Sequence, residues 1–167
     1  RIPAFLCVTA DAYNAFLDDT GLRERILLEL HRKRFQDMRW EEIWDCATRI
    51  RNLFLRKALP ASLAAALHSA VAERFAGRSV VVRSSAPEED AAGSSFAGLH
   101  ASYVNIRGTE SVLDHIRKVW ASLWSDAALL YRQELGLEAG RSAMAVMVQT
   151  LIDGQASGVC FSQSPTE

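Results

Sequence analysis

The segment VVVRSSAPEEDAAGSSFAGLHASY, residues 80–103, changes character at its fourth residue. Three consecutive valines are typical of a buried β-strand. They are followed by Arg83, two serines, an acidic cluster and a loop rich in glycine, serine and alanine. A strand that delivers polar groups to one point is a common way to build a ligand site. It is also a common way to end a strand, so both interpretations are open at this point.

The guanidinium of Arg83 follows a strand that should be buried. It therefore pairs with a carboxylate, extends into solvent or meets a ligand anion. Glu88, Glu89 and Asp90 are the nearest internal partners along the chain. The same three carboxylates are also candidates to hold a Mg²⁺ ion that accompanies phosphates. Adjacent carboxylates in a loop are more often simply solvated, which is the third interpretation of this cluster.

The loop GSSFAG, residues 93–98, supplies backbone N–H groups and hydroxyls. Glycine lets the main chain approach a ligand, and successive N–H groups can bind an anion. The spacing matches neither the GxxxxGK[ST] phosphate loop nor the GxGxxG dinucleotide motif. An arginine at a strand end followed by such a loop still indicates a phosphate site.

The composition is that of a water-soluble globular domain. The 167 residues are 49% hydrophobic and 23% charged, which is enough for one domain or for two small lobes. The 19 basic and 20 acidic residues give a net charge of -1. A near-neutral chain lacks the field that attracts polyanions, so nucleic acid is not an expected partner. No apolar run is long enough to span a membrane, and no membrane partner is expected.

Three widely spaced cysteines, Cys7, Cys46 and Cys160, show neither a CxxC pair nor the spacing of a zinc site. Each has apolar neighbours, so we expect three buried, reduced thiols and a cytoplasmic protein. The N-terminal residues 1–13 lack the pattern of a signal peptide. They resemble a strand entered in the middle of a domain, so we expect the sequence to be part of a longer protein.

Hydrophobic periodicity predicts helices on both sides of the central segment. The basic run HRKR, residues 31–34, is placed in the last turn of one of them, as a solvated helix end or an anion site. Trp pairs spaced four apart, at 40 and 44 and at 120 and 124, are interpreted as helical core rather than as stacking platforms. The predicted helices are one that follows Thr9 and others at 22–35, 40–57, 60–76 and 110–135.

Short strands are predicted at 4–9, 79–83 and 103–106. Two more, at 142–152 and 156–164, are joined by a hairpin-like turn with the sequence DGQ. Helices and strands therefore do not alternate regularly, which favours an α+β fold.

Four blocks of this sequence, in order, resemble one family. They are the opening IPAFLCVTADAY, the segment VRSSAPEEDAAGSSFAG with its following Ser-Tyr, the helix RKVWASLWSDAALLYR, and the C-terminal MAVMVQTLIDGQASGVCFSQSP. The resemblance is to the nucleotide-binding domain of phosphoenolpyruvate synthase, pyruvate phosphate dikinase and the rifampin phosphotransferases. It implies an ATP-grasp fold, in which two α+β lobes close on ATP. Residues 1–145 would form the first lobe and 146–167 the start of the connecting or second lobe.

The resemblance also implies roles for particular residues. Arg83 would bind the ATP phosphates and take part in catalysis, and Gly98 and Ser102 would lie against the phosphates. Gln149, Thr150 and Leu151 would lie in the strand that meets the adenine. No metal ligand is expected within residues 1–167, because the Mg²⁺-binding residues of the family lie further along its chain.

The sequence departs from the family pattern at several positions. Ser102 stands where threonine is usual, and Leu99 and His100 replace two polar amides. Ala4 replaces a glycine in the opening block. The contacts made by residues 99 and 100 therefore differ from those of the family, whereas Ser102 keeps the hydroxyl.

The resemblance implies an ATP-dependent phosphotransferase with ATP and Mg²⁺ as cofactors. A dikinase of the phosphoenolpyruvate synthase type would pass the β-phosphoryl group of ATP through a histidine to pyruvate, and it would release AMP and phosphate. A rifamycin acceptor is one alternative. A nucleotide-binding module without turnover is another, and residues 1–167 by themselves are expected to be inactive because phosphoryl transfer needs metal and cation stabilisation.

Overall fold

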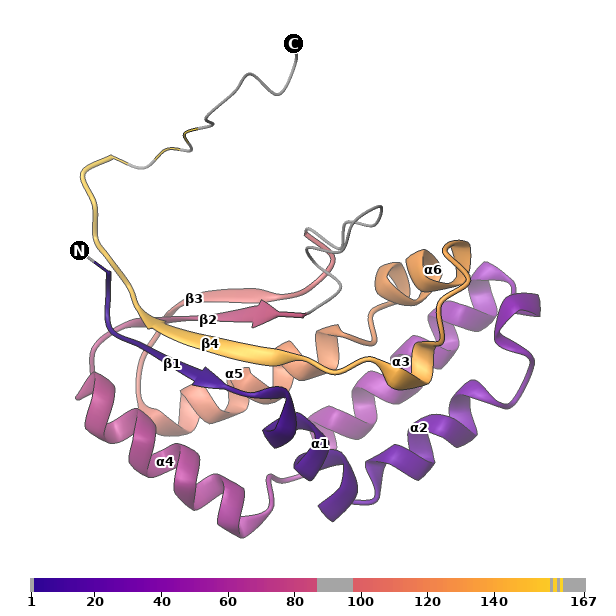
Figure 1. The fold of residues 1–167 in the computed structure, drawn as a ribbon, viewed down its shortest axis with the longest axis horizontal. Coiled ribbons are helices and arrows are strands. Elements are labelled where there is room, and N and C mark those ends of the chain that lie inside the picture. Colours follow the sequence, from indigo (N-terminus) through magenta and orange to yellow (C-terminus); the bar gives the residue numbers. More distant parts are fainter. Residues whose placement is uncertain (1, 87–97, 157, 159, 161–167) are drawn as a thin grey trace.

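A computed structural model describes residues 2–86, 98–156, 158 and 160 of this chain, and its described part is α+β (Figure 1). Helices pack against one four-stranded antiparallel sheet, which confirms the predicted α+β class. The elements in chain order are β1 (Phe5–Val8), α1 (Ala10–Asp19), α2 (Leu22–Leu30), η1 (Phe35–Asp37), α3 (Trp40–Arg56), α4 (Ala61–Phe75), β2 (Val80–Ser85), β3 (Ser102–Ile106), α5 (Thr109–Ser122), α6 (Asp126–Glu134), η3 (Ala139–Arg141) and β4 (Ala145–Thr150).

The strand order in the sheet is β1-β4-β2-β3. The last strand of the described chain, β4, therefore lies between the first strand and the valine-rich strand β2. Alternate residues of β2 and β4 are buried: Val80 and Val82 in β2, Val146 and Val148 in β4. Since side chains alternate across a strand, the residues between them project from the opposite face.

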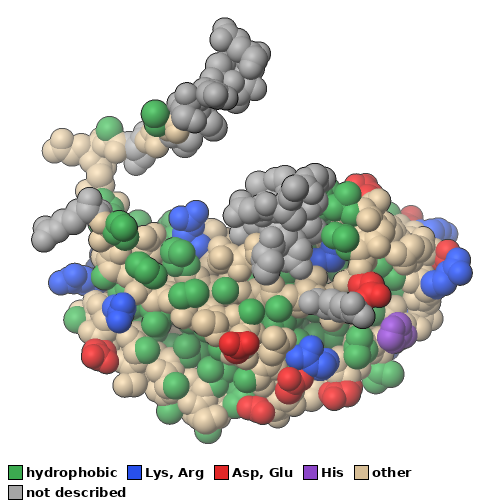
Figure 2. All heavy atoms as spheres, viewed as in Figure 1, with side chains coloured by type: hydrophobic (Ala, Val, Ile, Leu, Met, Phe, Trp, Pro, Cys, Tyr) green, Lys and Arg blue, Asp and Glu red, His purple; other side chains and the backbone are tan. Residues whose placement is uncertain are grey.

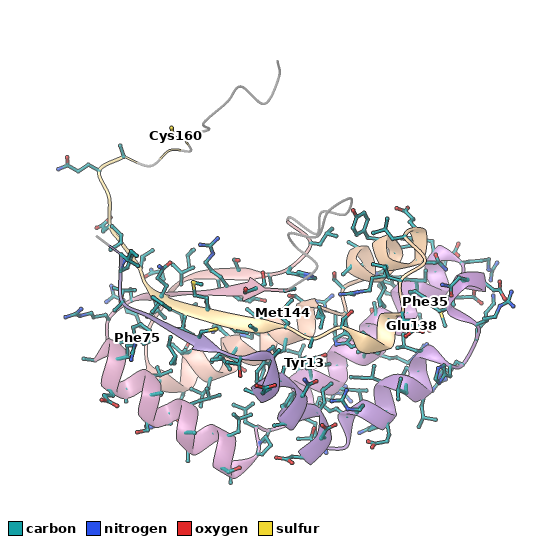
Figure 3. All side chains as sticks on the ribbon, viewed as in Figure 1. Tyr13, Phe35, Phe75, Glu138, Met144 and Cys160 are labelled. Carbon is teal, nitrogen blue, oxygen red and sulfur yellow. The ribbon has the colours of Figure 1, made fainter. Side chains whose placement is uncertain are left out.

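All the helices that contact the sheet cover the face that these valines occupy. α1, α4 and α5 contact the strands, while α2, α3 and α6 pack outside them on other helices. Tyr13 and Phe75 lie in the layer between helices and sheet (Figure 3). Trp124 is also fully buried, and its Nε1–H donates to Tyr13 Oη at 3.0 Å. The helices therefore form one core with this face of the sheet.

The predicted helix at 22–35 was too long, because α2 ends at Leu30. The basic run 31–34 lies after the helix, so it is not in its last turn. Lys33 and Arg34 instead form ion pairs with Glu42 and Asp37, each at 2.7 Å. Asp37 lies in η1 and Glu42 in the first turn of α3, so both pairs join the basic run to the elements that follow it.

The predicted helix at 110–135 was also wrong, because it is two helices. α5 ends at Ser122, and Ser125 caps the N-terminus of α6 by accepting a hydrogen bond from the N–H of Ala128 at 3.2 Å. Serine followed by aspartate is a typical start of a helix, because both satisfy free N–H groups or the helix dipole. The apolar periodicity runs through the break and concealed it.

The two tryptophan pairs have opposite environments. Trp120 and Trp124 are buried as predicted, but Trp40 and Trp44 are 59% and 52% exposed, so the prediction of core was wrong for that pair. The buried residues of α3 are Ile43, Cys46, Ala47, Ile50 and Phe54. Both tryptophans lie beside this stripe, and helical spacing alone does not say which neighbouring stripe faces the core.

The cysteine prediction holds for one thiol of three. Cys46 is buried, and desolvation raises the pKa of its thiol above the ordinary value. Cys7 and Cys160 are exposed, so burial was wrong for both. Cys7 has apolar sequence neighbours, but its strand turns it away from the helices.

The C-terminal strand predicted at 142–152 is shorter, because β4 covers Ala145–Thr150 only. In the predicted strand 156–164, the described residues Ala156, Gly158 and Cys160 are not in a strand, so that prediction is wrong for these three. The remaining residues of that range lie outside the described part. Among the described helices, none is long and apolar enough to cross a membrane.

Candidate functional site

One row of side chains crosses the whole sheet on the face away from the helices. Cys7 of β1 is paired with Met147 of β4, Met147 with Arg83 of β2, and Arg83 with Ser102 of β3. Residues directly opposite each other in an antiparallel sheet project from the same face. We call this face, marked by Cys7, Met147, Arg83 and Ser102, the open face, because no described helix covers it (Figure 1).

Arg83 is exposed near the end of β2. Within residues 2–86 and 98–156, its guanidinium forms no hydrogen bond or ion pair. The internal partners considered from the sequence, Glu88, Glu89 and Asp90, lie outside the described residues, as does most of the loop at 93–98. Arg83 therefore presents its charge on the open face next to Ser102.

Gly98 and Ser102 reach this region from the other side of the loop. Gly98 has φ +78°, a left-handed conformation that glycine adopts without strain. Among the described residues, no atom lies within 4 Å of the position that a Cβ atom at Gly98 would take. Ser102 is exposed and begins β3, directly opposite Arg83. The two loop residues that the resemblance assigned to phosphate, Gly98 and Ser102, thus flank a three-residue stretch, 99–101, that leads to the position beside Arg83.

Gln149 lies one step along the open face. It is paired with Val81 of β2, which makes it a diagonal neighbour of Arg83. Diagonal neighbours in an antiparallel sheet are about 7–8 Å apart, within the span of a nucleotide's polar groups. Gln149 is also paired with Phe5 of β1, an exposed aromatic residue. The open face therefore includes the cation Arg83, the polar Ser102 and Gln149, and the apolar Phe5 and Met147.

Thr150 and Leu151 are placed differently from Gln149. Thr150 is paired with the buried Val80 and so projects from the helix-covered face, where its hydroxyl oxygen is buried. The N–H of Thr150 donates to the carbonyl of Ala4, and that of Leu151 donates to the carbonyl of Ser79, both at 2.9 Å. Neither N–H group is left for a ligand. The sheet register brings together Arg83, Ser102 and Gln149 and turns Thr150 away.

Sequence reasoning missed the apolar part of the open face. Met147 and Val81 lie between the polar residues, and Val104 is 66% exposed on β3. In the structure, alternate residues of AVMVQT in β4 differ in burial. Because both sets are apolar, the sequence did not indicate which set faces the helices.

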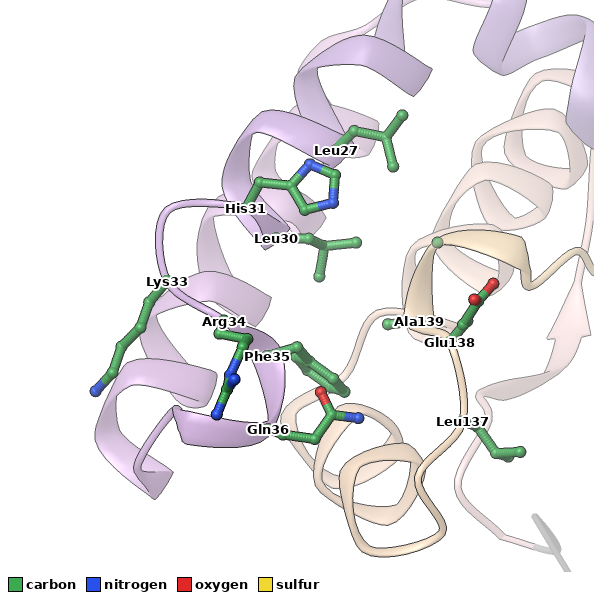
Figure 4. A pocket seen from close by; sticks show the side chains of 11 residues that line it. Leu27, Leu30, His31, Lys33, Arg34, Phe35, Gln36, Leu137, Glu138 and Ala139 are labelled. Atoms are coloured by element: carbon green, nitrogen blue, oxygen red, sulfur yellow. The ribbon is translucent and has the colours of Figure 1, made fainter.

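A cavity of about 470 Å³ lies elsewhere, between the end of α2, η1 and residues 137–140. Leu27, Leu30 and Phe35 point toward Ala139 across it, whereas Lys33 points away (Figure 4). The nearby cations Lys33 and Arg34 are already in the ion pairs given above. This cavity is therefore mainly apolar and does not match a site for phosphates.

Charges elsewhere are mixed. On the surface seen in Figure 2, Lys and Arg side chains are interspersed with Asp and Glu. In the described part of the chain, no group of three or more His, Cys, Asp or Glu side chains is arranged to hold a metal ion. The acidic cluster at 88–90, one alternative considered for Mg²⁺ from the sequence, lies outside the described residues.

Comparison with known proteins shows the family of this chain. The family described as "Pyruvate phosphate dikinase, AMP/ATP-binding domain" matches residues 1–167. A rifampicin phosphotransferase from Streptomyces sviceus is 36% identical over 165 residues, which cover 99% of this chain and 19% of that protein. A probable phosphoenolpyruvate synthase from Methanothermobacter thermautotrophicus is 32% identical over 170 residues, 99% of this chain and 25% of that protein.

A phosphoenolpyruvate synthase from Aeropyrum pernix is 34% identical over 169 residues, 98% of this chain and 20% of that protein. The chain thus spans a quarter or less of the length of these three relatives. The match of the family over every residue, together with these relatives, confirms the resemblance that the four sequence blocks indicated. The chain belongs to the pyruvate phosphate dikinase AMP/ATP-binding family, and it is an ATP-binding domain.

Proposed function

We propose that the open face binds the polyphosphate and base of ATP, with Arg83 and Ser102 at the phosphates and Gln149 toward the adenine. The observation that carries this proposal is the shared face: three polar residues from three strands lie together, and the cation has no partner in the described residues. An arginine presents planar donors that match phosphate oxygens. At Gly98, which has no side chain, the main chain of the loop can come close to the phosphates.

The apolar residues of the open face support the same proposal. Phe5 and Val104 have large apolar side chains that are exposed. Exposure of apolar surface to water is unfavourable in free energy, so a ligand or a second lobe that covered them would gain stability. A nucleotide base and a second lobe would both cover them. We therefore propose an ATP-grasp arrangement, in which ATP is held between this sheet and a second lobe.

The pairing of β4 supports a different limit for the first lobe. The sequence placed the lobe boundary near residue 145, at the beginning of this strand. Because β4 pairs with both β1 and β2, we propose that the first lobe extends through Thr150 and that the chain after it leads to the second lobe.

For the whole protein, we propose a dikinase-type phosphotransfer. ATP, pyruvate and water would give AMP, phosphoenolpyruvate and phosphate through a phosphorylated histidine in another part of the protein. Bound Mg²⁺ supplies neutralisation of the phosphate charge in such reactions. In this chain, Arg83 would hold and orient the phosphates beside it. Transfer to a rifamycin is the second candidate, because relatives named rifampicin phosphotransferase match this chain as well as the synthases do.

The test follows labelled phosphates in the full-length protein. We expect label from [γ-³²P]ATP in inorganic phosphate and label from [β-³²P]ATP first on the protein in acid-labile form. Pyruvate and a rifamycin are then added separately to the labelled protein. The compound that takes up the β-phosphoryl label is the acceptor. ADP as the product would contradict the proposal. Bound ATP with neither AMP nor labelled protein would favour the module without turnover.

A further inference from the structure

The main chain between Gly98 and Ser102 is held by a hydroxyl from the end of α5. Ser122 Oγ accepts a hydrogen bond from the N–H of Ala101 at 2.9 Å and donates one to the carbonyl of Val119 at 2.7 Å. The donated bond uses the only proton of the hydroxyl, so its oxygen must act as the acceptor toward Ala101. The direction of both bonds is therefore determined.

The residues on either side of Ser122 are anchored in the core. Its neighbours Trp120 and Trp124 are fully buried. Trp120 Nε1–H donates to the carbonyl of Met144 at 3.2 Å, directly before β4. Because β4 pairs with β2, the end of α5 is connected to the strand that carries Arg83. Ser122 therefore holds Ala101 at a defined position relative to the strand that carries Arg83.

The same junction makes a second, weaker contact with this stretch. Ser125, the N-cap of α6, donates from its hydroxyl to the carbonyl of Leu99 at 3.5 Å. The stretch is thus bound at residues 99 and 101 by the α5–α6 junction and at Ser102 by its pairing with Arg83. Gly98, at its start, carries the left-handed φ that directs the chain toward this junction.

We propose that Ser122 is a positioning residue for the nucleotide phosphates. It holds the main chain of residues 99–101 so that Gly98 and Ser102 are already arranged beside Arg83 before ATP binds. The inference rests on the proposed function, because it takes these residues as the phosphate contacts. Without the Ser122 hydroxyl, the stretch has to be ordered during binding, and that ordering opposes binding.

The experiment measures the affinity of full-length variants for ATP and for adenosine, by competition with a fluorescent nucleotide. We expect Ser122→Ala to weaken ATP binding about three- to tenfold, the range of one net hydrogen bond. Adenosine affinity should stay unchanged, because adenosine has no phosphates. Ser122→Thr keeps a hydroxyl and should restore most of the affinity. Ser111→Ala, which removes a hydroxyl from the first turn of the same helix, should have no effect on either ligand.

Hydrogen exchange at the Ala101 amide shows whether the bond was removed, and we expect faster exchange in Ser122→Ala. Faster exchange with unchanged ATP affinity would overturn the inference and leave the proposed function intact. An equal loss of ATP and adenosine affinity would also overturn it, since that is the result of a general structural defect. If the wild-type protein binds ATP no more tightly than adenosine, the proposed phosphate site fails, and the inference fails with it.

Discussion

Replacing Arg83 by alanine should weaken ATP binding and leave the stability of the fold almost unchanged. The side chain is exposed and has no partner among the described residues, so its loss should change the free energy of unfolding by no more than about 0.5 kcal/mol. Hydrogen bonds to a charged group are worth about 1.5–3 kcal/mol. Loss of the guanidinium should therefore weaken ATP binding about 10- to 150-fold. Arg83→Lys keeps the charge but not the planar pair of donors, so it should give an intermediate loss.

The assay is calorimetric titration of the full-length protein with Mg·ATP, alongside urea unfolding and AMP formation. Arg51→Ala is the matched control, since Arg51 is exposed on α3 in the helix layer and its removal changes the net charge equally. The affinity loss should shrink in high salt, which screens exposed charges. Arg83→Ala with wild-type ATP affinity and wild-type AMP formation would refute the role assigned to this residue.

Three further predictions concern single substitutions. Gly98→Ala should weaken ATP binding about fivefold, because the left-handed backbone costs alanine about 1 kcal/mol; titration with Mg·ATP checks this, and unchanged affinity would contradict it. Tyr13→Phe leaves the buried Nε1–H of Trp124 without its acceptor and should destabilise the fold by about 1–3 kcal/mol in urea unfolding, whereas a cost near zero would show the bond to be dispensable. The hydrogen bond from Lys118, followed by that from Arg117, lowers the pKa of Asp114, so the stabilisation is present at neutral pH and is lost as the pH falls through the folded-state pKa. Asp114→Asn should therefore be less stable than wild type at pH 7, the deficit should shrink as the pH falls through the lowered folded-state pKa of Asp114, and an equal deficit at neutral and acid pH would exclude this linkage.

Much of the fold was predictable from local patterns. The helices after Thr9 and Pro60 were placed by their apolar spacing, because a helix that buries one face must repeat apolar residues every three or four positions. The break at Ser125 was missed although its capping signal is present, because the apolar stripe continues across it. The exposure of Trp40 was missed for a related reason: periodicity locates a stripe on a helix but not the partner that covers it.

The sequence by itself determined the family and the α+β class, and it led to the proposal of a phosphate site at Arg83 and the glycine loop, because these depend on residue types and spacing within short segments. Only the tertiary structure decided which residues share a face. Ser102 lies opposite Arg83, Gln149 lies diagonal to it, and Thr150 is turned to the helices. These relations are set by the register of three strands distant in sequence, and a shift of one residue would reverse every one of them.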